Sequence, residues 1–168
     1  LMAAAGFHTA FQQVGLHKQI ANRILEPWFH IQLLVTSTDY GNFFGLRCHK
    51  DAHPEIQALS DAMLYAYMTS TPVSRYPGQW HLPFGDKELP EAASSMQKVA
   101  ICTARAARIA YKNFEGRIDF QSDIDLHDRL AGAGHWSPFE HCAEAMPDHA
   151  AYGNFIGWKP YRKMFKNE

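Results

Sequence analysis

DAHPEIQALSDAMLYAYMTST, residues 51–71, carries the clearest periodic pattern in the chain. Its apolar side chains fall three or four positions apart, at Ile56, Leu59, Met63, Leu64 and Tyr67. That spacing places them on one face of an amphipathic α-helix. Pro54 stands where the first turn of a helix tolerates proline. The pattern therefore predicts a helix that buries one face against a core.

Helical patterns recur on both sides of this stretch. They cover residues 1–14, 17–26, 40–47, 91–111 and a segment from Ser122 to the glycines Gly132 and Gly134. Pro27 is expected to end the second of these helices, because proline lacks the backbone N–H that a helix interior needs. Asp39 is expected to cap the third. Ser122 and Asp125 are expected to form the capping pair of the last one.

Two segments predict extended structure. Residues 28–38 contain HIQLLVTST, a run of β-branched and apolar residues that predicts a buried strand. Residues 72–90 are rich in Pro and Gly and predict an ordered loop with a short strand. The patterns together predict an α/β fold: one domain over residues 1–168, with helices packed on a small sheet. Because the sequence opens inside a helical pattern, we expect its beginning to be incomplete.

Composition narrows the class of protein. The 168 residues include 16 Lys and Arg against 17 Asp and Glu, which gives a formal net charge of -1. This balance argues against bulk binding of nucleic acid through a basic field. No apolar run approaches the roughly 20 residues that a membrane span needs, and no secretory leader pattern is present. The three cysteines have no CxxC spacing, so we expect a reduced, cytoplasmic protein.

Two arginines stand among apolar neighbours. Arg23 lies in the segment that precedes Pro27, and Arg47 ends the stretch NFFGLR. A guanidinium is costly to bury unless an anion meets it, and a phosphate or an ionised pyrimidine would serve. The alternative is a structural salt bridge to Glu26 or Glu55, which the local sequence alone favours because most arginines are structural.

HWSPFEH, residues 135–141, places two histidines, a hydroxyl and a carboxylate within seven positions. Donors and acceptors grouped on one turn can bind a cofactor or orient a reacting group. A Ser-His-Glu hydrolase is a weaker interpretation, because no GxSxG elbow surrounds Ser137. A metal site is weaker still. The structural alternative is an ordinary loop whose polar side chains are satisfied.

Two further stretches each allow a functional and a structural interpretation. CHKDAHPE, residues 48–55, alternates four side chains that could line a metal: His49, Asp51, His53 and Glu55. A polar helix N-terminus is favoured, because acidic residues suit that end of the helix dipole. The tail places Arg162 and Lys163 among aromatic residues, where they could contact phosphate or single-stranded nucleic acid. A docked or frayed tail is favoured there, and no metal is expected.

Four stretches together resemble one family. RILEP at residues 23–27, NFFGLRCHKDAHPEI at 42–56, ARIAY at 107–111 and GHWSPFEH at 134–141 are similar to motifs of flavin-dependent thymidylate synthases. Those motifs are R-x-x-x-P, N-x-x-x-L-R followed by a glutamate, A-R-x-S-[YF] and H-x-[ST]-P-F-E-H. Four matches that keep their internal spacing are more specific than any single one. The resemblance covers most of residues 15–141.

The resemblance implies a reaction, its cofactors and its assembly. In that reaction a one-carbon unit passes from 5,10-methylenetetrahydrofolate to C5 of dUMP. Hydride arrives from FAD, which NADPH reduces. The resemblance also implies a homo-oligomer, a tetramer in the family, whose subunits share active sites. General physical chemistry is consistent with this reaction. A flavin carries the hydride chemistry, and the protein supplies anion binding, stacking surfaces and a dry pocket.

The resemblance also implies roles for individual residues. Arg47 corresponds to the arginine that contacts the uracil and favours its ionisation at N3, and it is the expected catalytic residue. Arg23 corresponds to an arginine that helps hold the nucleotide. One asparagine and four loop residues correspond to the flavin and folate side of the site: Asn42, His135, Ser137, Glu140 and His141.

Three differences separate the chain from the usual family pattern. The signature R-H-R-x-x-S-x-N-E-x-S-x-R-Y is absent, and WKPYRKMFKNE only echoes its opening. The PFEH loop follows the R-x-x-x-P helix, as in a phage-type branch, and Ala110 replaces the serine of the third motif. We therefore expect a C-terminal portion whose signature is supplied by a partner chain, or else no activity. The alternatives are a related uracil-C5 hydroxymethylating enzyme and a catalytically inactive flavin- or nucleotide-binding subunit.

Overall fold

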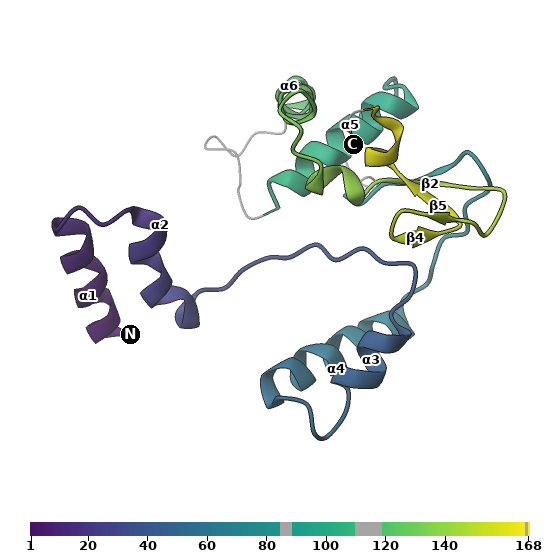
Figure 1. Cartoon of the computed structure of the whole chain (residues 1–168). Helices are drawn as coiled ribbons and strands as arrows, with labels where there is room; N and C mark the ends of the chain where they lie inside the picture. The colour runs from purple at the N-terminus through teal and green to yellow at the C-terminus, as the bar shows by residue number, and fades with distance from the viewer. Residues whose placement is uncertain (85–88, 110–118, 167) are drawn as a thin grey trace. The chain divides into compact units, whose positions relative to one another are not determined.

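The computed structural model describes residues 1–84, 89–109, 119–166 and 168 (Figure 1). The chain forms two compact units, Leu1–Leu33 and Leu34–Glu168. The prediction of one domain over residues 1–168 stays a prediction. The mixed α/β class is confirmed, because the described residues form helices together with small antiparallel sheets.

The first unit contains two α-helices and a 3₁₀-helix. These are α1 (Met2–Gln13), α2 (Lys18–Ala21) and η1 (Asn22–Trp28). The two predicted helices are confirmed, but the prediction that Pro27 ends the second is wrong. The helix tightens to 3₁₀ geometry after Ala21, and the N–H of Phe29 still donates to the carbonyl of Glu26 at 3.0 Å, past the proline.

The strand predicted within 28–38 is not formed, and residues 29–37 are irregular. A strand needs backbone partners on a neighbouring strand, and this segment pairs with none among the described residues. Its alternating apolar side chains Ile31, Leu33 and Val35 are exposed. β-Branched composition alone therefore did not determine the structure here.

The second unit begins with a helix pair, α3 (Gly41–Arg47) and α4 (Pro54–Thr69), which lie side by side in Figure 1. Both helices confirm the predicted helical segments, but the predicted burial of one face of α4 is wrong: only Ser60 is buried, and Leu59 and Tyr67 of the apolar face are exposed. The Asp39 carboxylate accepts a hydrogen bond from the backbone N–H of Gly41 at 2.7 Å. The N-cap residue, however, is Tyr40, whose side chain forms no capping hydrogen bond, so the prediction that Asp39 caps this helix is corrected by one position. The Phe44 ring joins the helices, with its centroid 5.8 Å from that of Tyr67.

A second helix pair consists of α5 (Ser95–Ala107) and α6 (Phe120–Gly132). α5 begins later than predicted, because Ser94 and Gln97 form a reciprocal capping box. The predicted end of this helix, at residue 111, lies outside the described residues. α6 begins before Ser122, which corrects the prediction. The Asp119 carboxylate caps it by accepting from the N–H of Gln121 at 3.0 Å.

A buried ion cluster joins α5 to α6. Asp123 is fully buried, and its carboxylate pairs with the guanidinium groups of Arg108 and Arg105, the latter at 3.5 Å. The Arg105 guanidinium also donates to the carbonyl of Phe84 at 3.0 Å. Burial raises the pKa of Asp123, and the two neighbouring guanidinium groups lower it, so they offset part of the cost of burying the charge.

Two small antiparallel sheets complete the second unit. The first has the order β1 (Trp80–His81), β2 (Ala143–Ala145) and β5 (Trp158–Pro160). The second pairs β3 (Ala151–Tyr152) with β4 (Phe155–Ile156). Two 3₁₀-helices flank the strands, η2 (Ser137–Glu140) and η3 (Tyr161–Met164). β1 confirms the short strand predicted within 72–90.

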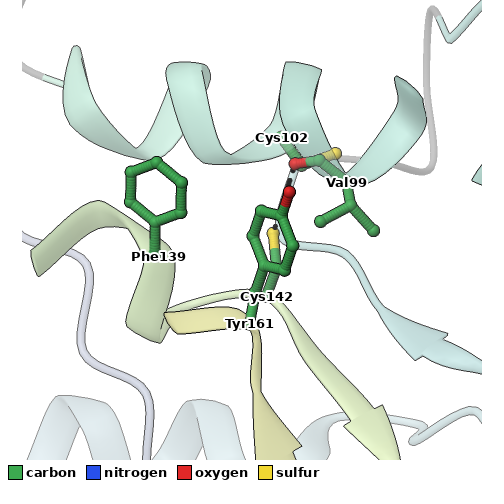
Figure 2. Packing of buried hydrophobic residues seen from close by; sticks show 5 residues of the cluster. All are labelled: Val99, Cys102, Phe139, Cys142 and Tyr161. Atoms are coloured by element: carbon green, nitrogen blue, oxygen red, sulfur yellow. Dashed lines mark hydrogen bonds between the residues drawn. The ribbon is translucent and has the colours of Figure 1, made fainter. Parts of the chain in front are cut away.

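The core lies where α5, η2, β2 and η3 meet. Its buried cluster consists of Val99, Cys102, Phe139, Cys142 and Tyr161, which Figure 2 shows beneath α5. The Cys142 thiol lies 3.8 Å from the carbonyl oxygen of Val99, to which it donates. Because Tyr161 is part of this cluster, the basic aromatic tail is docked rather than frayed. No helix in the described part of the chain has both the length and the apolar character of a membrane span.

Candidate functional site

A cavity of about 680 Å³ lies within the second unit. Its walls come from the segment 36–41, from α3 and α4, and from the small sheets. The volume lies within the range of roughly 300–1,000 Å³ that is typical of small-molecule sites. The cavity is therefore large enough for a heterocyclic ligand.

Aromatic rings form one part of the lining: Tyr40, Phe44 and Tyr67. The Tyr40 and Phe44 rings are stacked, with centroids 5.7 Å apart. The Tyr40 hydroxyl donates to the carbonyl of Val35 at 3.1 Å. Burial raises the pKa of Tyr40, against a backbone hydrogen bond to Ser37 that lowers it. The hydroxyl therefore stays protonated at neutral pH, and these residues offer flat, uncharged surfaces.

A second part of the lining belongs to the strands. His81 on β1 and Trp158 on β5 meet edge to face, with ring centroids 6.3 Å apart. Both strands pair with β2, which places His81 opposite Ala143 and Trp158 opposite Ala145. The hydroxyl of Thr38 accepts from the N–H of Ile156 at 3.2 Å, so it holds the segment 36–41 against β4. These side chains add an imidazole and a hydroxyl to the lining, which also contains the polar residues Thr36, Ser37 and Asp39.

His141 lies beside this cavity. Its Nδ1 atom is 2.9 Å from the hydroxyl of Thr36, which lines the cavity. Burial lowers the pKa of His141, the Glu140 carboxylate raises it, and His81 lowers it. The net direction is downward, which favours the neutral imidazole. A neutral imidazole can donate a hydrogen bond through one nitrogen and accept through the other.

Glu140 is engaged by the C-terminal segment. One carboxylate oxygen lies 3.3 Å from Nε of Arg162, and the other accepts from the Asn154 amide at 3.4 Å. The oxygen near Arg162 is shielded from solvent and accepts no hydrogen bond from the described residues. The guanidinium therefore offsets the charge of this carboxylate.

His135 and Ser137 lie apart from the cavity lining. Both are exposed, and neither side chain has a polar partner within the described residues. The backbone N–H of His135 donates to the carbonyl of Leu130 at 3.0 Å, just past the end of α6. Their predicted contacts with cofactor stay predictions, while Glu140 and His141 lie on the segment that leads to β2 and the cavity.

Asn42 and Arg47 lie at the two ends of α3. Asn42 is exposed and follows Gly41, which lines the cavity. Arg47 is exposed at the other end, and its guanidinium forms no ion pair with a described residue, Glu55 included. The salt bridge considered from the sequence is therefore not formed. The predicted contact of Arg47 with the uracil stays a prediction.

Arg23 lies in η1 of the first unit. It is exposed and has no ion pair with Glu26 or with any other described residue. Because Arg23 and Arg47 belong to different units, the prediction that both hold one nucleotide stays a prediction.

The metal interpretation finds little support in the described residues. His49 lies 3.5 Å from the Asp51 carboxylate, yet no three His, Cys, Asp or Glu side chains gather as metal ligands there. No disulfide joins the three cysteines. In Cys142, burial raises the pKa to about 12, so this thiol is unreactive at neutral pH.

Sequence reasoning missed several cavity residues, among them Tyr40, Tyr67, His81 and Trp158. Tyr67 was predicted as a core residue of its helix, and Trp158 as part of a tail. His81 stands in a Pro- and Gly-rich loop, directly after Trp80 and three residues before Phe84. The available signal was the prediction that this loop is ordered, because an ordered loop has to pack against other parts of the chain.

No protein-family model matches this chain, and no curated protein or solved structure does either.

Proposed function

We propose that the chain acts as a flavin-dependent thymidylate synthase, converting dUMP to dTMP with 5,10-methylenetetrahydrofolate, FAD and NADPH. One observation carries the proposal. Two stretches that resemble this family, NFFGLR and HWSPFEH, approach the same cavity although about a hundred residues separate them. Phe44 lines it from the first stretch, and His141 bonds to the cavity residue Thr36 from the second.

The lining suits a flavin. Aromatic faces at Tyr40, Phe44 and Trp158 can pack against a planar ring system. Hydroxyls at Thr36 and Thr38 and the imidazole of His81 supply the polar contacts that orient a ligand. When bound, FAD would supply the hydride. The residues of this chain would exclude water and hold the ring edge.

Arg47 supports the proposal as the anion partner. An arginine stays charged and can stabilise a uracil anion that develops during the reaction. Because Arg47 is exposed and unpaired among the described residues, replacing it breaks no ion pair within that part of the chain. A change at Arg47 should therefore affect the ligand and spare the fold.

The first experiment measures binding of the cofactor and turnover of the substrate separately. The purified chain is titrated with FAD and followed by the 450 nm band and by flavin fluorescence. Release of tritium from 5-tritiated dUMP is then measured with methylenetetrahydrofolate and NADPH. We expect flavin binding that weakens about tenfold in Phe44→Ala and is unchanged in Trp28→Ala, an exposed aromatic residue of the first unit. No flavin binding at micromolar concentration would contradict the proposal.

The second experiment tests the arginine. Arg47→Ala should abolish dUMP binding in calorimetry and change the free energy of unfolding by less than about 0.5 kcal/mol. Arg75→Ala is the matched control, since Arg75 is an exposed arginine of the same unit outside the four motifs. If dUMP bound to Arg47→Ala as tightly as to the parent, the assigned role would be wrong.

A catalytically inactive binding subunit is the second candidate. The observation that favours it is the engagement of Glu140 by Arg162, which leaves this motif carboxylate occupied within the chain. Flavin binding without tritium release would support it. Hydroxymethylation at C5 of the uracil is separated from methylation by mass spectrometry of the nucleotide product.

A further inference from the structure

Arg162 connects the C-terminal segment to the loop that carries His141. It lies in η3, directly after β5. Its Nε atom is 3.3 Å from the Glu140 carboxylate and donates to the Glu168 carboxylate at 2.6 Å. Glu168 also pairs with Lys163 at 2.8 Å. Arg162 therefore lies between two carboxylates, of which one belongs to the motif loop.

The backbone keeps Arg162 and Glu140 in place. The N–H of Tyr161 donates to the carbonyl of Cys142 at 2.8 Å. Tyr161 and Cys142 also belong to the buried cluster shown in Figure 2. Since Tyr161 precedes Arg162 and Cys142 lies two residues after Glu140, this contact fixes both ends of the ion pair. A cation held by a rigid scaffold keeps its partner in one position at little entropic cost.

We propose that Arg162 is a positioning residue that acts through Glu140 on His141. By holding the Glu140 carboxylate, it fixes the loop so that the imidazole meets Thr36 at the cavity, and it limits the negative charge next to that imidazole. This proposal rests on the proposed function, because its consequence is the orientation and charge of the wall against which the flavin would bind.

The surrounding charges make the effect measurable. Within the described part of the chain, the ionisable groups that act on His141 are Glu140, on its own segment, and His81, on β1. The third neighbour is the neutral hydroxyl of Thr36. Glu140 raises the pKa of His141, against burial and His81. Without the Arg162 cation, the negative charge of Glu140 would act more strongly on the His141 imidazole and raise its pKa further.

The test is an NMR titration of the His141 ring in the full chain, without added ligand. In Arg162→Gln we expect the His141 midpoint to rise by about 0.5 pH unit, and in Glu140→Gln we expect it to fall. In the double variant the midpoint should equal that of Glu140→Gln alone. Lys163→Gln is the matched control, because Lys163 pairs with Glu168, and it should leave the midpoint unchanged.

Two results would overturn the proposal. One is an unchanged midpoint in Arg162→Gln. The other is a rise of equal size in the Glu140→Gln background, which would show that Arg162 does not act through Glu140. If Arg162→Gln fails to fold, Glu140→Gln decides the question, since an unchanged midpoint there also overturns the proposal.

A second measurement tests whether the ion pair between Arg162 and Glu140 affects flavin binding. FAD affinity should fall about tenfold in Arg162→Gln and be largely restored in Arg162→Lys, which keeps the cation. The titration needs no FAD, so the two proposals can fail separately. Absence of flavin binding in the parent chain would contradict the proposed function, whereas unchanged affinity in Arg162→Gln would contradict the role of Arg162.

Discussion

The first unit leaves its large apolar side chains exposed, whereas the core of the second unit buries such side chains. In Leu1–Leu33 only Ala4 and Ala21 are buried, and large side chains such as Phe7 are exposed. In the core, Phe139 has no exposed surface at all. A phenylalanine is therefore expected to contribute more to the free energy of unfolding in the core than in the first unit.

The difference shows which elements depend on long-range packing. α5 buries Ala106 and the run 99–104, and part of this face packs against segments distant in sequence. α1 buries one alanine and begins without a capping side chain. Helices of this length are marginal when isolated, and their stability comes mostly from packing of an apolar face. Substitutions in the core should therefore be costly, and matched substitutions in the first unit should not.

The largest expected effect is at Phe139. Phe139→Ala should lower the free energy of unfolding by about 4 kcal/mol, because it leaves a cavity among the rings of Tyr161, Trp136 and Phe165. Phe7→Ala, at an exposed phenylalanine of α1, should change it by less than about 0.5 kcal/mol. Urea unfolding followed by circular dichroism measures both. Equal losses would remove the contrast between the regions.

The next effect is at the buried ion cluster. Asp123→Ala should cost about 3 kcal/mol, because the change leaves the guanidinium groups of Arg105 and Arg108 without their buried carboxylate. Asp125→Ala is the control on the same helix, at an exposed carboxylate. Thermal unfolding of the two variants gives the comparison. A smaller loss at Asp123 than at Asp125 would mean that this cluster does not stabilise the α5 and α6 pair.

Alkaline pH should weaken the core through Cys142. Its pKa is raised to about 12 in the folded chain, from an ordinary value of 9.0. A raised pKa means that the stabilising contribution is complete below pH 9 and is lost as the pH rises toward 12. The slope is at most about 1.4 kcal/mol per pH unit. Urea unfolding between pH 9 and 11 should show this slope in the parent and a shallower one in Cys142→Ala. Parallel slopes would contradict the assignment.

The smallest expected effect is at the start of α5. Ser94→Ala should cost about 1 kcal/mol, because it removes the capping hydrogen bond to the N–H of Gln97. Ser95→Ala, one position later and exposed, is the matched control and should be nearly neutral. Differential scanning calorimetry can resolve the difference. An effect at Ser95 as large as that at Ser94 would show that the cap contributes nothing specific.

Local patterns predicted much of the helical structure. The helix over 51–71 and a polar contact of Asp39 at the start of α3 were predicted because spacing and hydrogen-bonding groups are local properties. The strand within 28–38 was wrong, because a strand depends on a partner that the segment itself does not specify. Helix starts were misplaced by a few residues where a nearer capping group, such as Asp119, determined the start.

The candidate site was predictable only in part. The resemblance singled out His141, which the structure places beside the cavity through Thr36. It gave no indication of His81 or Trp158, which meet through the pairing of β1 and β5 with β2. Such contacts arise from strand register, and the register of β1 with β2, which are more than sixty residues apart, leaves no local pattern.

The edges of the three-stranded sheet bear on how the chain behaves at high concentration. β1 and β5 form these edges and contain only two and three residues. β5 includes Lys159 and ends in Pro160, which has no amide hydrogen to offer a neighbouring strand. Short edges with lysine and proline resist pairing with strands of other molecules. This sheet is therefore a poor template for amyloid-like aggregation.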